Sequence, residues 1–312
     1  MIRIAIALSL LAISAAEAAL ECSSCHRTIA ASFARTAHAN TSRPASDGSI
    51  LGPFDEHRNT LSTRVPGVYF RMEKRDGGFY QTGVEGSRSQ TEPFDLVIGS
   101  GRRGQSYLYW RHGLLFQLPV SYHAGSNRWI NSPGYEDGRV HFGRGIPPQC
   151  MDCHASRFQL ENTAGRIRYA EDYTLGIGCG KCHGEADRHD QIVRPSGIDL
   201  CARCHSGLQE DTRPEPDVHG NQVGLLKASR CFQQSGAMTC STCHDVHRVE
   251  RDPGTLSARC GACHDVKACP TAASMKENAR TQCVGCHMPV LPSKVIQVQT
   301  YRTHRIAVYA GK

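Results

Sequence analysis

Cysteine and histidine side chains recur in this chain in one fixed pattern. The sequence contains seven copies of Cys-x-x-Cys-His. Two thiols three positions apart can form thioether bonds to the two vinyl groups of one porphyrin, and the adjacent histidine can then reach the iron. The pattern therefore predicts seven covalently attached haem c groups. The copies are Cys22, Cys25 and His26; Cys150, Cys153 and His154; Cys179, Cys182 and His183; Cys201, Cys204 and His205; Cys240, Cys243 and His244; Cys260, Cys263 and His264; and Cys283, Cys286 and His287.

Zinc binding is the alternative interpretation, because paired cysteines with a histidine also suit a tetrahedral zinc ion. Zinc fingers, however, pair one Cys-x-x-Cys with a second one or with two spaced histidines. The present copies all have the same five-residue form. The pattern favours haem.

The first 18 residues resemble an export signal. Arg3 is followed by an apolar stretch from Ile4 to Ile13, and Ala16-Glu17-Ala18 has the small-x-small form of a cleavage site. We therefore expect a signal peptide over 1–18 and export to the periplasm or the cell surface. No other stretch of about 18 apolar residues occurs, so the mature chain is expected to lack an integral membrane segment.

The formal charge of +7 does not by itself indicate nucleic acid as a partner. Seven haems would add about −14 from their propionates and about +7 from their ferric centres. The oxidised protein would then be nearly neutral. We interpret the basic residues mainly as counter-charges and expect no nucleic-acid partner.

The motifs are unevenly spread along the chain. The second copy begins 128 residues after the first, and the last six lie between Cys150 and His287. This spacing predicts an N-terminal haem segment over 19–45, a haem-free β-rich unit over 46–146 and a six-haem domain over 147–312.

The haem-free unit contains short apolar runs separated by turn residues. Turn signals such as Arg75-Asp76-Gly77-Gly78 and Arg111-His112-Gly113 predict a small antiparallel unit of consecutive hairpins. The expected strands are Val68–Met72, Phe79–Thr82, Phe94–Ile98, Ser106–Trp110 and Leu114–Tyr122.

From Cys150 onward, apolar residues are too few for a conventional core. There the porphyrins themselves would fill the interior. The expected fold class is a multihaem cytochrome of short helices and loops packed around haems. It would have little regular secondary structure, with the β unit inserted after the first haem.

Each iron has a second axial position, and nine further histidines are available to fill it. Methionine is a poor alternative because Met151 lies inside a motif and Met288 adjoins a motif histidine. Bis-histidine ligation at every site is therefore possible and predicts low reduction potentials.

Several segments resemble the multihaem cytochromes related to the tetrahaem electron acceptor of hydroxylamine oxidoreductase. The similarity covers most of the mature chain, although Glu185-Ala186 stands where relatives often have Pro-Gly. The segments are Cys22-Ser-Ser-Cys25-His26 with Ala37-His38-Ala39; Cys179-Gly-Lys-Cys182-His183-Gly184 with His189; Cys240-Ser-Thr-Cys243-His244-Asp-Val-His247; Cys283-Val-Gly-Cys286-His287-Met288-Pro289 with Thr303-His304-Arg305; Val97-Ile-Gly-Ser-Gly101; Ser106-Tyr-Leu; Leu115-Phe-Gln-Leu-Pro119; and Ser132-Pro-Gly-Tyr135.

The resemblance implies which histidines are distal ligands. His247 is only three residues past His244, so it cannot reach the far side of the same haem and would ligate a neighbouring one. His112 and His123 are interpreted as ordinary polar residues. The positions that match family ligands are His38, His189, His219, His247 and His304, and those at similar recurring positions are His57 and His141.

Cys231 and Cys269 belong to no motif. In an oxidising compartment we expect a disulfide between them, with free thiols and thiolate ligation of an iron as alternatives.

Two functions fit these features. The favoured one is electron transfer through closely packed haems, with redox partners such as other cytochromes or a membrane quinol-linked complex. The alternative is an oxidoreductase with one open haem that acts on a small nitrogen or sulfur compound. The β unit could also be a docking surface. Its candidate proton donors and cations for catalysis are Arg102, Arg103, His112, Tyr122 and His123.

Overall fold

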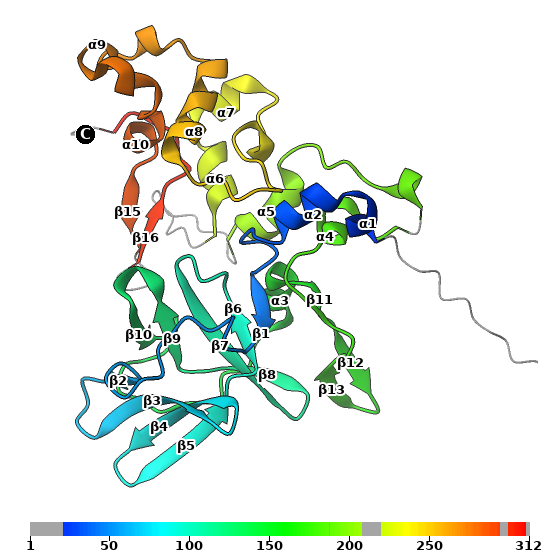
Figure 1. The fold of residues 1–312 in the computed structure, drawn as a ribbon, viewed down its shortest axis with the longest axis vertical. Helices are drawn as coiled ribbons and strands as arrows, with labels where there is room; N and C mark the ends of the chain where they lie inside the picture. Colours follow the sequence, from blue (N-terminus) through cyan, green and yellow to red (C-terminus); the bar gives the residue numbers. More distant parts are fainter. Residues whose placement is uncertain (1–20, 187, 208–219, 294–298, 310–312) are drawn as a thin grey trace, which may run out of the picture.

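The computed structural model describes residues 21–186, 188–207, 220–293 and 299–309. The expected signal peptide and His219 therefore lie outside the described residues. In the described ranges no helix is long and apolar enough to cross a membrane. Figure 1 shows two sheets at one end of the molecule and most of the helices at the other.

The β unit consists of two antiparallel sheets. The first has the strand order β2-β3-β4-β5, and in the second β1, β6, β7, β9 and β10 lie side by side while β8 pairs with another part of β7. The four-stranded sheet contains β2 (Thr60–Ser62), β3 (Val68–Arg75), β4 (Gly78–Glu85) and β5 (Arg88–Pro93). The six-stranded sheet contains β1 (Ser42–Pro44), β6 (Leu96–Ile98), β7 (Gly104–Arg111), β8 (Leu114–Gln117), β9 (Val120–His123) and β10 (Arg128–Asn131), with the short 3-10 helix η1 (Ala124–Ser126) between the last two.

Turn residues fix the registers of the hairpins. Asp76 and Gly77, between β3 and β4, have φ angles of 51° and 74°. His112 and Gly113, between β7 and β8, have φ angles of 52° and 76°. Two successive positive φ angles make the two-residue turn whose twist matches that of paired strands. His112 is therefore a turn residue.

All five expected regions contain strand, with two differences: the strand expected over Phe94–Ile98 begins only at Leu96, and the last one is divided. The run expected to be one strand over Leu114–Tyr122 is interrupted before Pro119, and its halves, β8 and β9, pair with different parts of β7. Strands β1, β2, β5 and β10 were not anticipated. β5 has the polar sequence Arg-Ser-Gln-Thr-Glu-Pro with an exposed first half, so it lacks the apolar alternation that identifies a strand.

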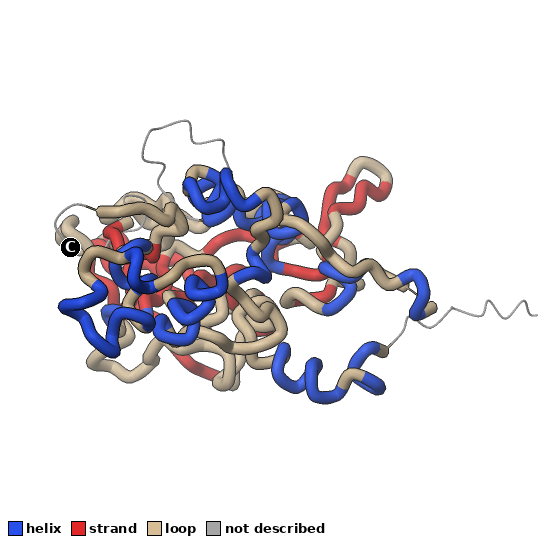
Figure 2. Tube along the Cα trace, turned by 90° about the horizontal axis from the view of Figure 1, so that it is seen from above, coloured by secondary structure: helices blue, strands red, loops and turns tan. Residues whose placement is uncertain are grey.

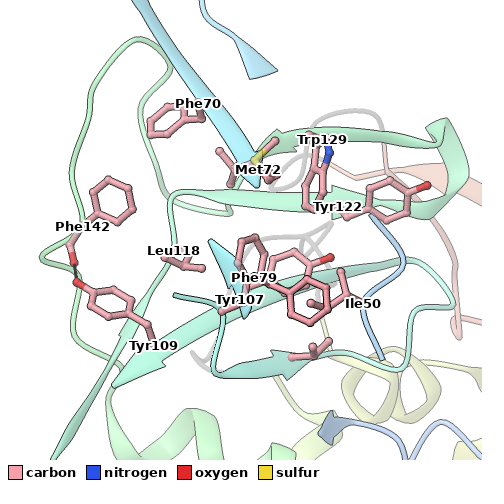
Figure 3. Close-up of a cluster of buried hydrophobic side chains, with 13 residues drawn as sticks. Ile50, Phe70, Met72, Phe79, Tyr107, Tyr109, Leu118, Tyr122, Trp129 and Phe142 are labelled. Atoms are coloured by element: carbon pink, nitrogen blue, oxygen red, sulfur yellow. Dashed lines mark hydrogen bonds between the residues drawn. The ribbon is translucent and has the colours of Figure 1, made fainter. Parts of the chain in front are cut away.

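The two sheets bury a common apolar core (Figure 3). Alternate residues of β3 point inward, among them Phe70 and Met72, and meet Tyr107 of β7 and Trp129 of β10 across the interface. Gln81 crosses the same core: its side-chain amide donates to Val120 O at 3.2 Å and accepts from Val120 N at 2.8 Å. The β unit thus has a conventional core of its own.

The opposite face of the six-stranded sheet supports the second motif. Leu96, Leu108 and Leu115 pack there against Met151, which lies inside α3 (Pro148–His154). This contact joins the haem-free unit to the rest of the chain.

The remainder of the chain is made of short elements separated by loops (Figure 2). Among the described residues of this part, the apolar cluster away from the sheets has three buried members, Ile198, Val223 and Leu226. The helical elements are α1 (Cys22–Cys25), α2 (Arg27–Phe33), α4 (Cys179–His183), η2 (His189–Gln191), α5 (Asp199–His205), α6 (Gln222–Lys227), α7 (Arg230–Ser235), η3 (Cys240–Thr242), α8 (Pro253–Ala258), η4 (Arg259–Ala262), η5 (Val266–Ala268), α9 (Ala272–Met275), η6 (Lys276–Arg280) and α10 (Cys283–His287).

Three two-stranded sheets also occur after α3, where only helices and loops were expected. Each is a small antiparallel pair, and the pair β12-β13 has nearly all of its residues exposed. They are formed by β11 (Ala155–Arg157) with β14 (Thr174–Leu175), β12 (Leu160–Thr163) with β13 (Arg166–Tyr169), and β15 (Val290–Pro292) with β16 (Thr300–Arg302).

Candidate haem centres

Each Cys-x-x-Cys-His copy folds as one helical turn. In the copies that begin at Cys22, Cys240 and Cys260, the histidine N–H donates to the carbonyl of the first cysteine at 2.8 to 2.9 Å. A helical turn places residues i, i+3 and i+4 on one face. Both thiols and the imidazole of a motif can therefore face the same macrocycle.

Four motif histidines lie opposite a second imidazole. An iron bonded to two imidazole nitrogens at roughly 2.0 Å each would separate the ring centroids by about 6.3 Å. The observed centroid separations match this spacing. They are 6.2 Å for His26 and His189, 6.0 Å for His205 and His38, 6.0 Å for His183 and His247, and 6.3 Å for His244 and His304.

In every pair the second histidine comes from another part of the chain. His189 follows the third motif but faces the first, and His247 follows the fifth motif but faces the third. His38, which follows the first motif, faces the fourth. The pairs therefore join segments that are distant in sequence.

Backbone anchors hold these second histidines in place. Ser32 of α2 donates to the carbonyl of His247 at 2.7 Å, and Ile177 N donates to the carbonyl of His38 at 3.1 Å. The buried Ser229, just before α7, donates to the carbonyl of His304 at 3.3 Å. Residues from other parts of the chain thus hold these second histidines in position.

Hydrogen bonds also orient several motif histidines. Nδ1 of His183 lies 2.9 Å from Val193 O, and Nδ1 of His287 lies 2.9 Å from Ala307 O. A carbonyl acceptor requires the proton on Nδ1, which leaves the lone pair of Nε2 for a metal. Nδ1 of His154 is likewise 2.7 Å from Thr41 Oγ1.

Burial favours the neutral form of three of the paired histidines. It lowers the pKa of His304 to about 4, with a further contribution from the neighbouring His244, and it lowers the pKa of His38 and of His244. His304 Nδ1 is buried without a hydrogen-bond partner among the described residues. Neutral imidazole is the form that binds a metal.

The other histidines of the expected ligand set are placed differently. His57 lies in an exposed turn between β1 and β2, and the ring of His141 contacts Tyr135. Both therefore belong to the β unit, and neither forms a ring contact with a described motif histidine. Among the described residues, no second imidazole lies in ring contact with His264 or His287 either.

Thiols of different motifs are neighbours. Each motif has at least one such neighbour, so the attachment points form one connected series. The neighbouring thiols are Cys22 and Cys179, Cys182 and Cys201, Cys201 and Cys240, Cys243 and Cys263, Cys260 and Cys283, and Cys153 and Cys204.

The expected disulfide between Cys231 and Cys269 is wrong, because both thiols are free. Cys231 lies beside Cys243 of the fifth motif, and Cys269 forms a hydrogen bond with Thr271 Oγ1 at 3.3 Å. This bond lowers the pKa of the Cys269 thiol. Sequence spacing gave no information on these two environments.

The residues present fit haem better than zinc. Within the described residues, no cluster of three or more His, Cys, Asp or Glu side chains is arranged to hold a metal ion, as a tetrahedral zinc site would require. Opposed imidazoles at the bis-histidine spacing suit an iron that lies between them.

A basic cavity of about 290 Å³ brings together three of the five residues of the β unit that the sequence offered as candidates for catalysis. Arg102, Arg103 and His123 line it, whereas His112 occupies the β7–β8 turn and the Tyr122 hydroxyl donates to Asn127 in the β unit. The sequence named Arg102, Arg103 and His123 as candidates, but it did not show that they share a cavity with Gln299 and Thr300.

Comparisons with known proteins agree with these features. The family model described as cytochrome c554 and c-prime matches residues 136–184, which include the motifs that begin at Cys150 and Cys179. The dissimilatory sulfite reductase MccA of Wolinella succinogenes is 23% identical over 196 residues. That match covers 46% of this chain and 28% of the relative, so it spans little more than a quarter of the relative's length.

A solved structure shares the fold. The crystal structure of the outer cell wall cytochrome OcwA has a TM-score of 0.56 with this chain at 14% sequence identity. The similarity covers 91% of this chain and 78% of the other. With the repeated Cys-x-x-Cys-His motifs, these findings identify a multihaem c-type cytochrome.

Proposed function

We propose that this chain is an exported heptahaem electron carrier. The observation that carries the proposal is the set of four opposed imidazole pairs. The haems would supply redox-active irons. A six-coordinate iron with two histidine ligands changes electron count without changing ligation, which suits electron transfer and leaves no position for a substrate.

The neighbouring thiols support a route for the electrons. Ordered by these contacts, the motifs follow the series first, third, fourth, fifth, sixth and seventh, with the second beside the fourth. The route would therefore run between the motif of Cys22 and the motif of Cys283, with a branch from the fourth motif, which begins at Cys201, to the second, which begins at Cys150.

Electron paramagnetic resonance of the oxidised protein tests the proposal, together with haem content per chain. We expect about seven haems and a ferric spectrum that is predominantly low-spin. High-spin ferric iron in most of the haems would contradict the carrier function.

A second candidate is an oxidoreductase that acts on a small sulfur or nitrogen compound. One support is the similarity to a sulfite reductase. The other is that, among the described residues, no second imidazole lies in ring contact with His264 or His287. A high-spin component of about one haem per chain, together with turnover of sulfite or hydroxylamine, would favour it. Fully low-spin iron would exclude it.

Location and partners belong to the same proposal. The expected signal peptide supports export to the periplasm or cell surface. The carrier would exchange electrons with other redox proteins, such as other cytochromes or a membrane quinol-linked complex. Fractionation of the native cells, followed by haem staining, tests the location.

A further inference from the structure

The basic cavity lies where the β unit meets the C-terminal segment. Residues of η1, just after β9, line one side, and Thr300 at the start of β16 lines another. It is lined by Arg102, Arg103, His123, Gly125, Ser126, Gln299 and Thr300. Its volume of about 290 Å³ is at the lower end of the range for ligand sites, so it suits a small ligand.

Among the described residues, no acidic side chain forms a salt bridge with the arginines around the cavity. Arg102 lies near Arg251, and Arg103 lies near Arg302, so four guanidinium groups approach one another here. Among the described residues none of the four forms a salt bridge. Burial and these neighbouring cations lower the pKa of both Arg102 and Arg103, which means that the positive charges are not compensated within this part of the chain.

Two of the four guanidinium groups are held in place by hydrogen bonds to backbone carbonyls. Arg103 donates to Thr300 O, and Arg302 donates to Val284 O at 3.1 Å and Met288 O at 2.7 Å. The guanidinium of Arg102 has no hydrogen-bond partner among the described residues. The N–H groups of the Arg102 guanidinium are therefore available to a ligand.

His123 adds a neutral donor. Its Nδ1 accepts from the backbone N–H of Ser126 at 3.1 Å, so the proton of the neutral ring is on Nε2. Burial and the nearby Arg128 and Arg103 lower the pKa of His123 and favour this neutral form. The cavity thus offers mainly donors and positive charge, which is the chemistry that binds oxyanions.

We propose that this cavity binds an oxyanion group, held by Arg102, Arg103 and His123. Arg102 also lies near His244. Two sources share the required chemistry: a propionate of the haem held by His244 and His304, or a free inorganic oxyanion such as sulfate or sulfite. The proposal does not depend on the electron-transfer function, because anion binding is measurable without turnover.

Calorimetric titration of the oxidised holoprotein with sodium sulfate tests the free-anion source, because sulfate does not react with haem. We expect binding that weakens as ionic strength rises. Arg102→Gln should weaken it by about 10-fold or more, because a charge-assisted hydrogen bond is lost. The matched control is Arg88→Gln, which removes an exposed arginine of β5.

A redox titration tests the propionate source. If a propionate occupies the cavity, sulfate will not bind, and Arg102→Gln will lower the midpoint potential of one haem because a cation that opposes oxidation is removed. Arg88→Gln should leave every potential unchanged. Arg102→Lys keeps the charge and should recover much of either effect, which separates charge loss from misfolding.

The outcomes are distinguishable. Sulfate binding that depends on Arg102 supports a free anion, and an altered potential without sulfate binding supports a propionate. If Arg102→Gln matches Arg88→Gln in both assays, the cavity does not bind an oxyanion. That result would not contradict the proposed electron-transfer function.

Discussion

Replacing His247 by alanine should remove one axial ligand from the iron held by His183. The iron of the motif next to His247 in sequence, held by His244, should keep both of its ligands. The two ring centroids are 6.0 Å apart, which is the spacing expected for two imidazoles on opposite faces of one iron. Removing one imidazole leaves a five-coordinate ferric iron, which is high-spin in the absence of another strong ligand. We therefore expect about one seventh of the haem to change spin state.

A second variant tests whether the pairs are distinct. His304→Ala should open the iron of His244, which lies 6.3 Å from His304 between ring centroids. Because the two variants affect different irons, the double variant should contain about two sevenths high-spin haem. Integrated electron paramagnetic resonance spectra, normalised to haem content per chain, measure the fractions. His112→Asn, in an exposed turn, is the control and should remain low-spin.

Two results would refute the reasoning. If the double variant has no more high-spin iron than either single variant, His247 and His304 do not serve separate haems. If His247→Ala leaves the spectrum unchanged at full haem content, the crossed pairing with His183 is wrong.

The remaining predictions concern the scaffold that places the ligands. Gln81→Leu should lower the free energy of unfolding by about 3 kcal/mol in chemical denaturation, because it leaves the buried N–H and C=O of Val120 unpaired. Gly176→Ala should produce new high-spin iron, since a Cβ there would lie 2.3 Å from a carbonyl oxygen of the segment that joins α2 to β1. Burial raises the pKa of Asp95, so its carboxyl contributes stability below pH 3.8 that is lost as pH rises through its folded pKa. Asp95→Asn keeps the acceptor for Trp110 N and should remove this loss in a pH series of unfolding curves.

Matched variants separate these effects from general destabilisation. Gln90→Leu, on β5, changes an exposed glutamine and should cost little stability. Gly165→Ala has a similar positive φ of 79° with no atom within 4 Å, so it reports backbone strain without the close contact expected at Gly176. Equal spectra for the two glycine variants would argue against the contact.

The sequence by itself determined the chemistry and much of the β unit. The Cys-x-x-Cys-His spacing sets a local geometry within one helical turn, so it can be recognised without knowing the fold. The hairpins were also predictable, because alternating apolar residues and turn pairs such as Asp76-Gly77 act within a few residues. The polar strand β5 was missed, because its pairing depends on a neighbouring strand and not on its own composition.

Only the tertiary structure decided which histidines face each other. The resemblance placed His57 and His141 with His38 among the expected second ligands, yet the structure places these two in the β unit and places His38 opposite His205. The pairing of His183 with His247 likewise depends on how α2 anchors a distant loop. The arginines of the cavity converge from segments far apart in the chain. Such encounters depend on the path of the whole backbone, and no local pattern of residues encodes them.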